Sequence, residues 1–244
     1  MNTGGTERGY PGEAYDRAWR ELVFPRDYRN PEPRRRYHLV VIGAGPAGLV
    51  VSIAAAGLGA RVALVERRAM GGDCLNVGCV PSKALLEFTR RHPDRGADDA
   101  FAWLRRVRSE IAHHDSVERY RQHGVDVFLG AATFPDRDSV AVDRHRLQAR
   151  RFVIATGARA ALPPIPGLAS CSPLTNETIF DLVEVPRRLA ILGAGPIGCE
   201  LAQAMARLGV EVHLFEMARR VLPGESAAAG EVLARALQSE GIAL

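Results

Sequence analysis

Residues 37–48 read Tyr37-His38-Leu39-Val40-Val41-Ile42-Gly43-Ala44-Gly45-Pro46-Ala47-Gly48, and this stretch decides the fold. Its first six residues form an apolar run that is typical of a buried parallel strand. The GxGxxG turn that follows connects such a strand to a helix. We therefore expect a strand, a tight turn and a helix that runs to about Leu58, where Gly59 ends it.

The next residues complete a unit that binds a dinucleotide. Arg61 to Glu66 supply a second strand, and Glu66 lies 23 residues after Gly43. Gly43 makes the tight turn, Gly45 lets the backbone approach a pyrophosphate, and Gly48 lets helix and strand pack closely. The helix N-terminus stabilises the phosphate charge, and Glu66 is predicted to accept hydrogen bonds from a ribose.

The same unit recurs 150 residues later. Between residues 41–66 and 191–216, 12 of 26 positions are identical without a gap. The chain is therefore predicted to bind two nucleotides. Glu216 favours NAD over NADP in the second copy, because a carboxylate binds a free 2′-hydroxyl and repels a 2′-phosphate. Arg219 and Arg220 follow closely and act against this preference.

The remaining segments set the predicted organisation, an α/β fold with two Rossmann-like units. We expect one helix from about Asp98 to His123 and short strands at 125–129, 139–142 and 151–155. Prolines between 163 and 186 mark a crossover. The predicted parts are an N-terminal extension over 1–36 with at most a short helix at 15–22, a first nucleotide-binding domain over 37–165, a crossover over 166–185, and the start of a second domain over 186–244.

Composition excludes several classes of protein. The chain has 244 residues, 47% of them hydrophobic, which is enough for an ordinary core. Apolar stretches such as 49–58 are too short to span a bilayer, and the N-terminus lacks an export pattern, so we predict a cytoplasmic protein. The net charge is only +4, with acidic residues interspersed among the arginines. Nucleic acid is therefore not an expected partner.

Two cysteines five residues apart, Cys74 and Cys79, follow the first unit and are interpreted as a redox-active pair. An ideal helix would separate them by about 7.5 Å along its axis, so a disulfide requires a distorted turn, which Gly78 permits. Two unbridged core cysteines are the alternative. Cys171 and Cys199 are expected to be buried small hydrophobes, and the sequence predicts no metal site.

The segment from Cys74 to Lys83, Cys-Leu-Asn-Val-Gly-Cys-Val-Pro-Ser-Lys, resembles the active-site signature of the pyridine nucleotide-disulfide oxidoreductases. Dihydrolipoamide dehydrogenase, glutathione reductase and mercuric reductase belong to this family, and the resemblance covers about residues 37–244. It implies FAD in the first unit and NAD(P)H in the second, with NAD favoured. Electrons would pass from nicotinamide through flavin to a Cys74–Cys79 disulfide, and then to a small disulfide, a dithiol or Hg(II).

The resemblance also assigns roles to single residues. It places Cys79 next to the flavin, where a helix N-terminus favours the thiolate, and lets Cys74 exchange with substrate. It pairs Lys83, the chain's one lysine, with Glu200 near the flavin; a surface lysine is the alternative. The cofactor contacts predicted in this way are Gly43, Gly45, Pro46, Ala47, Gly48, Glu66, Gly72, Asp73, Lys83, Ala132, Thr156, Gly157, Gly193, Gly195, Pro196, Ile197, Gly198 and Glu216. For Thr156 and Gly157, an ordinary crossover turn is the alternative.

The family extends beyond the position at which this sequence stops. Its members continue through the rest of the nicotinamide domain and an interface domain that supplies an acid–base pair and makes them homodimers. We therefore expect an N-terminal portion, with the second unit incomplete and little turnover by itself. The predicted function is that of a mercuric reductase-like enzyme, with dihydrolipoamide dehydrogenase or a noncatalytic nucleotide-binding remnant as the alternatives.

Overall fold

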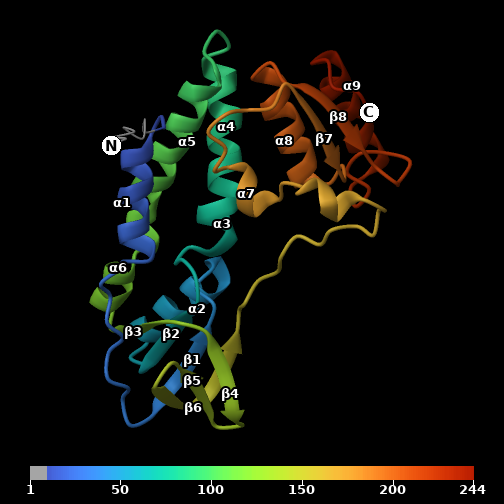
Figure 1. Ribbon diagram of the computed structural model, residues 1–244. Helices are drawn as coiled ribbons and strands as arrows, with labels where there is room; N and C mark the ends of the chain where they lie inside the picture. Colours follow the sequence, from blue (N-terminus) through green and yellow to red (C-terminus); the bar gives the residue numbers. More distant parts are fainter. Residues whose placement is uncertain (1–9) are drawn as a thin grey trace, which may run out of the picture. The chain divides into compact units, whose positions relative to one another are not determined.

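Strand β1 (Tyr37–Ile42) lies inside a six-stranded sheet in the computed structural model, which describes residues 10–244 (Figure 1). The strand order is β3-β2-β1-β6-β5-β4. Strand β1 pairs in parallel with β2 and β6, and β2 pairs in parallel with β3, whereas β4 and β5 are antiparallel. The other strands are β2 (Val62–Glu66), β3 (Val125–Leu129), β4 (Ala132–Asp136), β5 (Ser139–Val142) and β6 (His145–Ile154).

The sheet is buried most deeply where β1 and β2 run side by side. Every residue of β2 is buried, and β1, the apolar run predicted to be a buried parallel strand, is buried or half-buried throughout. One face carries a core cluster that joins β1 and β2 to the antiparallel strands. Its buried members are Tyr37, Val40, Ile42, Ala63, Val65, Phe128, Val140, Val142, Leu147 and Ala149.

Strand β6 is longer than the sequence pattern indicated. A strand was predicted at 151–155, but β6 begins at His145. Its first residues pair antiparallel with β5, as in Val142 opposite His145, and its later residues pair in parallel with β1, as in Ile42 opposite Ile154. Residues 145–149 alternate between buried and exposed, which is the burial pattern of a strand with one covered face.

The long helix predicted over 98–123 is wrong in one respect, because it is broken. Helix α5 (Ala97–Ala112) is followed by the 3-10 turn η1 (His113–Asp115) and by α6 (Val117–Gln122). Ser116 follows η1 and caps α6, because its Oγ accepts from the Arg119 N–H at 3.3 Å. A serine with extended backbone and this contact is a typical N-cap.

Residues 14–36 pack against the first sheet and its neighbouring segments, which the sequence pattern did not predict. Helix α1 (Glu13–Val23) contains the short helix expected at 15–22. Beyond it the chain follows β3: the Tyr28 hydroxyl donates to the Val127 carbonyl at 2.8 Å, and the Asn30 side chain bonds both backbone groups of Leu129 at 2.7 and 2.9 Å. Burial raises the pKa of Tyr28 to about 12. These contacts satisfy backbone groups that the outer edge of β3 would otherwise leave open.

The second copy forms a parallel pair, β7 (Arg188–Leu192) and β8 (Glu211–Phe215), linked by α8 (Pro196–Arg207). Helix α8 packs on one face of the pair, and α9 (Ala227–Ser239) packs on α8. Leu192 and Phe215 are exposed on the other face, as expected for an unfilled sheet. Ala243 begins a further parallel pairing with His213, next to β8.

The chain divides into two compact units that are not contiguous in sequence. The first comprises residues 14–79 and 108–177, and the second comprises residues 10–13, 80–107 and 178–244 of the described part. The remaining elements are α2 (Pro46–Gly57), α3 (Gly72–Val77), α4 (Cys79–Arg91), η2 (Leu168–Cys171) and α7 (Asn176–Ile179). Within residues 10–244 no helix has the length and apolar character to cross a membrane.

Candidate nucleotide and redox site

The first glycine turn is built so tightly that side chains cannot replace its hydrogens. Gly43 has φ +102°, a left-handed conformation that favours glycine, and a Cβ there would overlap the carbonyl oxygen of Ala155. A Cβ at Gly48 would overlap the carbonyl oxygen of Gly43. The second copy repeats this geometry, since a Cβ at Gly198 would overlap the carbonyl oxygen of Gly193. The packing role predicted for the third glycine is therefore present in both copies.

The acidic residue at the end of the second strand is held in the same way in each copy. One carboxylate oxygen of Glu66 accepts the Ala44 N–H at 2.8 Å, and the other accepts the Arg68 N–H at 2.8 Å. Glu216 accepts the Ala194 and Ala218 N–H groups at 2.8 and 2.9 Å. The Ala218 and Ala194 N–H groups lower the pKa of Glu216. A carboxylate oxygen can accept more than one donor, so both side chains retain capacity for a ribose hydroxyl.

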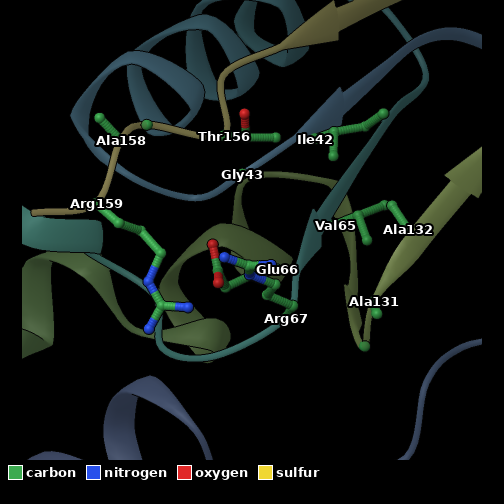
Figure 2. Close-up of a pocket in the computed structure, with 12 residues that line it drawn as sticks. Ile42, Gly43, Val65, Glu66, Arg67, Ala131, Ala132, Thr156, Ala158 and Arg159 are labelled. Carbon is green, nitrogen blue, oxygen red and sulfur yellow. The ribbon is translucent and has the colours of Figure 1, made fainter. Parts of the chain in front are cut away.

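A cavity of about 460 Å³ opens at the carboxyl ends of β1, β2 and β6 (Figure 2). This is within the range of small-ligand sites and at the edge where parallel sheets bind ligands. In Figure 2 the Glu66 carboxylate lies near the centre, with Arg159 on one side and Ala132 on the other. The lining residues are Ile42, Gly43, Val65, Glu66, Arg67, Gly130, Ala131, Ala132, Thr156, Gly157, Ala158 and Arg159.

The predicted cofactor residues of the first copy divide between this cavity and its surroundings. Five of them line it: Gly43, Glu66, Ala132, Thr156 and Gly157. Gly45, Pro46, Ala47, Gly48, Gly72 and Asp73 are not among the lining residues. The sequence interpretation missed Arg67 and Arg159, which bring two cations to a cavity of otherwise small, apolar and acidic side chains. Their positions directly after Glu66 and shortly after Gly157 were the available signal.

Arg159 is fixed by an ion-pair cluster at the rim of the cavity. Its guanidinium donates to both carboxylate oxygens of Glu177, at 2.9 and 2.7 Å, and Arg68 donates to the same carboxylate at 2.9 Å. The hydrogen bonds from Arg159 and then Arg68 lower the pKa of Glu177 to about 2. The bidentate geometry holds Arg159 in one orientation beside the cavity.

Replacing Glu177 tests this cluster through acid stability. A carboxyl group whose folded pKa is lowered from 4.5 to about 2 adds stability above pH 4.5 and loses it as the pH falls through 2. Glu177→Gln is expected to lower the free energy of unfolding at pH 7 by up to about 1 kcal/mol, the range of exposed ion pairs. Its free energy of unfolding should also fall less steeply between pH 4.5 and pH 2 than that of the unaltered chain. Urea titrations from pH 7 to pH 2 measure the free energy of unfolding at each pH. Glu231→Gln, at an exposed position of α9, is the control, and equal acid profiles for the two variants would contradict the assignment.

The cysteine segment packs directly against the first glycine turn. The Gly71 N–H donates to the Ala44 carbonyl at 2.8 Å, and a Cβ at Gly72 would overlap the Cα of Gly45. Helix α3 begins at Gly72 and carries Asp73 and Cys74 in its first turn. Two segments that the sequence analysis linked only by their order, the phosphate turn and the cysteine pair, are therefore in contact.

Gly78 separates the two cysteines into successive helices. It ends α3, and α4 begins at Cys79. A Cβ at Gly78 would lie 2.8 Å from the Asp73 carbonyl oxygen, closer than side chains tolerate. The distortion expected between the cysteines is thus present, and glycine is required for it. Cys74 is half-buried and Cys79 is exposed.

The second compact unit contains the ion pair that the resemblance implies between Lys83 and Glu200. The Lys83 ammonium lies 2.9 and 3.2 Å from the two carboxylate oxygens, and the Ser82 hydroxyl donates to the same carboxylate at 2.7 Å. Lys83 comes from α4 and Glu200 from α8. The Ser82 contact was not predicted, and it fixes the carboxylate from a second side.

The two other cysteines, Cys171 and Cys199, differ in their exposure to solvent. Cys199 is buried, as predicted, and burial raises the pKa of its thiol, with further effects from Glu216 and Glu200. The prediction of a buried Cys171 is wrong, because this residue is exposed at the end of η2. It lies in the proline-rich crossover, which leaves its side chain accessible.

In the second copy, the predicted contacts occupy equivalent places. Gly193 and Gly195 form the turn after β7, and Pro196, Ile197 and Gly198 form the first turn of α8. Together, the two strand–turn–helix copies and the cavity define an α/β protein of the Rossmann-like class.

Residues 37–244 match the family described as pyridine nucleotide-disulphide oxidoreductase. The chain belongs to this family, whose members are flavin-dependent enzymes that use FAD and NAD(P)H.

Individual relatives agree with this assignment. The chain is 34% identical over 230 residues to a mercuric reductase of Bacillus cereus, covering 88% of this chain and 36% of the relative. It is 36% identical over 233 residues to dihydrolipoyl dehydrogenase 3 of Pseudomonas aeruginosa, covering 84% and 49%. The HOCl-induced flavoprotein disulfide reductase RclA of Escherichia coli, solved as a Cu(II) complex, superposes with a TM-score of 0.74 at 31% identity, covering 84% and 48%. The chain thus spans half or less of the length of these relatives.

Proposed function

We propose that Cys74 and Cys79 form the redox-active disulfide of a flavin-dependent NAD(P)H oxidoreductase, and that the cavity beside Glu66 takes part of FAD. The observation that carries this proposal is the contact between Gly45 and Gly72, because it joins the phosphate turn to the loop that leads into Cys74. A nucleotide on this turn therefore lies beside the cysteine segment.

The residues around the cavity fit such a cofactor. The glycines leave a cradle that Cβ atoms would fill, and the N-terminus of α2 supplies the positive end of a helix dipole that would stabilise a phosphate. Glu66 offers acceptors to a ribose, and Arg67 and Arg159 supply positive charge. When bound, FAD would supply two-electron transfer between nicotinamide and the disulfide.

The two cysteines are proposed to have different roles. Cys79, the first residue of α4, is proposed to be the thiol that faces the flavin, the role that the family resemblance implies for it. Cys74 is the thiol that exchanges with substrate. Lys83, held by Glu200, is proposed to place its ammonium group near the flavin. A compact ammonium suits this position better than a planar guanidinium.

For the substrate we propose a small disulfide, a dithiol or Hg(II). A thiolate pair exchanges with disulfides and also binds soft metal ions, so its chemistry suits all three. The relatives named above include both a mercuric reductase and a dihydrolipoyl dehydrogenase. We favour a mercuric reductase-like activity and keep dihydrolipoamide dehydrogenase as the alternative. A cytoplasmic location, a homodimer of the full-length relatives and the absence of nucleic acid as a partner stay predictions.

For the nicotinamide cofactor we propose NAD. Glu216 presents a carboxylate where the ribose of the second nucleotide would lie. Arg220, which could have bound a 2′-phosphate, instead donates to the backbone carbonyls of Pro223 and Glu225 at 3.1 and 2.7 Å. Its guanidinium is therefore engaged by its own loop.

Anaerobic reduction of the purified chain tests the proposal. We expect the chain to bind FAD, and two-electron reduction by dithionite to produce a long-wavelength absorbance from a thiolate in contact with the flavin. NADH is expected to produce the same species faster than NADPH. A chain that binds FAD but gives no such band would contradict the redox pair, and a chain that takes up no FAD would support the noncatalytic alternative.

A further inference from the structure

Helix α1 is joined to the cysteine-bearing helix α3 by a half-buried hydrogen bond. The Trp19 Nε1–H donates to the Asn76 Oδ1 at 2.8 Å. The amide nitrogen of Asn76 donates in turn to the carbonyls of Gly72 and Met70, at 2.8 and 3.0 Å. Asn76 is thus fixed from both sides, two residues after Cys74.

A buried ion pair completes the connection. The guanidinium of Arg108 donates to the Asp16 carboxylate at 2.8 Å and to the Asn76 carbonyl oxygen at 3.0 Å, and it lies 4.0 Å from the centroid of the Trp19 ring. The side chains of Arg108 and Asp16 are only 1% and 5% exposed. Charges so deeply buried are tolerated only with their partners in place, so the arrangement is rigid.

Helix α3 depends on these contacts because it is too short to be stable without them. It has six residues, fewer than an isolated helix needs to be stable. The carbonyl of Asn76 belongs to its last turn, which lacks partners within the helix and receives Arg108 instead. The Met70 N–H, just before α3, donates to the Val23 carbonyl at the end of α1, at 3.0 Å.

We propose that α1 is a positioning element for the redox pair, in which Trp19 and Arg108 fix α3 and so set the reactivity of Cys74 and its tendency to bridge to Cys79. This inference rests on the proposed redox role of the two cysteines. Helix α1 lies outside residues 37–244, which match the family, so the family likeness does not supply it.

The variant Trp19→Phe tests this role, because it keeps an aromatic ring near Arg108 and removes the N–H donor together with part of the indole ring. Trp103→Phe is the matched control: the chain has two tryptophans, and Trp103 packs instead against Phe88 and Arg106. The first measurement is the alkylation rate of each cysteine in the reduced chain, by peptide mass spectrometry. Cys199 is buried, so faster alkylation of it would indicate a general loss of packing, and the exposed Cys171 is the internal standard.

In Trp19→Phe we expect Cys74 to be alkylated about three- to tenfold faster, the change that losing one hydrogen bond gives, with Cys199 and Cys171 unchanged. Trp103→Phe should leave all these rates as in the unaltered chain. A Cys74 rate that does not change, or that rises together with Cys199, would overturn the proposal.

The second measurement is the equilibrium constant between the Cys74–Cys79 disulfide and glutathione. If α1 only stabilised the fold, the substitution would not change this constant. Two glutathione thiols reduce the Cys74–Cys79 disulfide to two cysteine thiols and become one glutathione disulfide. Trp19→Phe should favour the dithiol about three- to tenfold more, which raises the potential by about 15–30 mV. An unchanged potential would overturn the proposal. If the unaltered chain forms no such disulfide, the proposed redox pair fails, whereas the alkylation rates still report on α1.

If Trp19→Phe does not fold, hydrogen exchange of the unaltered chain tests whether α1 and α3 are held by one network. Hydrogen exchange should then show residues 14–23 and 72–78 opening together, because one network holds them. Independent opening of 72–78, with α1 still protected, would refute the role of α1.

Discussion

Gly48→Ala is expected to lower the free energy of unfolding by about 2–3 kcal/mol and to abolish FAD binding. Its Cβ would overlap the carbonyl oxygen of Gly43 and lie 3.3 Å from the Val41 side chain. Overpacking a rigid site costs about 1–3 kcal/mol, and here the obstacle is backbone that cannot rotate away. Relief requires α2 to move off β1, which opens the turn that the phosphate would occupy. Urea titration followed by circular dichroism measures stability, and flavin fluorescence measures binding.

Gly57→Ala is the matched control for this change. Gly57 belongs to the same helix, and an added Cβ there meets nothing within 4 Å. Alanine is favoured over glycine in a helix by up to about 1 kcal/mol, so this variant should be as stable as the parent or more stable. If both variants lost stability or FAD to the same extent, the close packing at Gly48 would not be the cause.

Cys79→Ser is expected to remove the long-wavelength absorbance of the reduced chain completely, and Cys74→Ser is expected to retain it. The reason lies in the proposed roles of the two cysteines: Cys79, at the start of α4, faces the flavin, and Cys74, within α3, exchanges with substrate. Neither variant can form the Cys74–Cys79 disulfide. Spectra after anaerobic two-electron reduction distinguish the two roles.

Cys171→Ser controls for the loss of a thiol as such. Cys171 is exposed in η2, and its replacement should leave both FAD binding and the absorbance unchanged. A band that persists in Cys79→Ser and disappears in Cys74→Ser would show that the assigned roles are reversed. Its persistence in both variants would remove the thiolate as its source.

The two strand–turn–helix copies were predictable because their signals are local. Apolar runs, glycines with defined spacing and a terminal glutamate fixed β1, α2 and β2 to within about one residue of their observed bounds. The break at Ser116 was also a local signal, but a cap inside a charged, periodic segment is weak against the helical pattern around it. The early start of β6 depends on pairing with β5, which involves residues that its own sequence does not specify.

The candidate site was predictable where residue type alone decides and not where partners are distant. The glycines, Glu66 and the cysteine pair follow from the chemistry that each residue can perform. Glu177, which holds Arg159, also bonds Arg68, which lies 109 residues away in the sequence. The position of α3 depends on Asp16 and Arg108, which are 92 residues apart. No pattern in a short window shows that such groups meet.

The division of the chain into interleaved units has a consequence for how it is synthesised and cut. The second unit draws on residues 10–13, 80–107 and 178–244, and the first draws on 14–79 and 108–177. During translation, residues 10–13 cannot pack into the second unit until residues 80–107 and 178–244 have left the ribosome. Closing such long loops slows folding, because the chain loses conformational entropy before the long-range contacts form and add stability. A protease nick or a cloning boundary inside 80–107 would therefore damage both units, whereas separate expression of either unit requires rejoining its pieces by new connections.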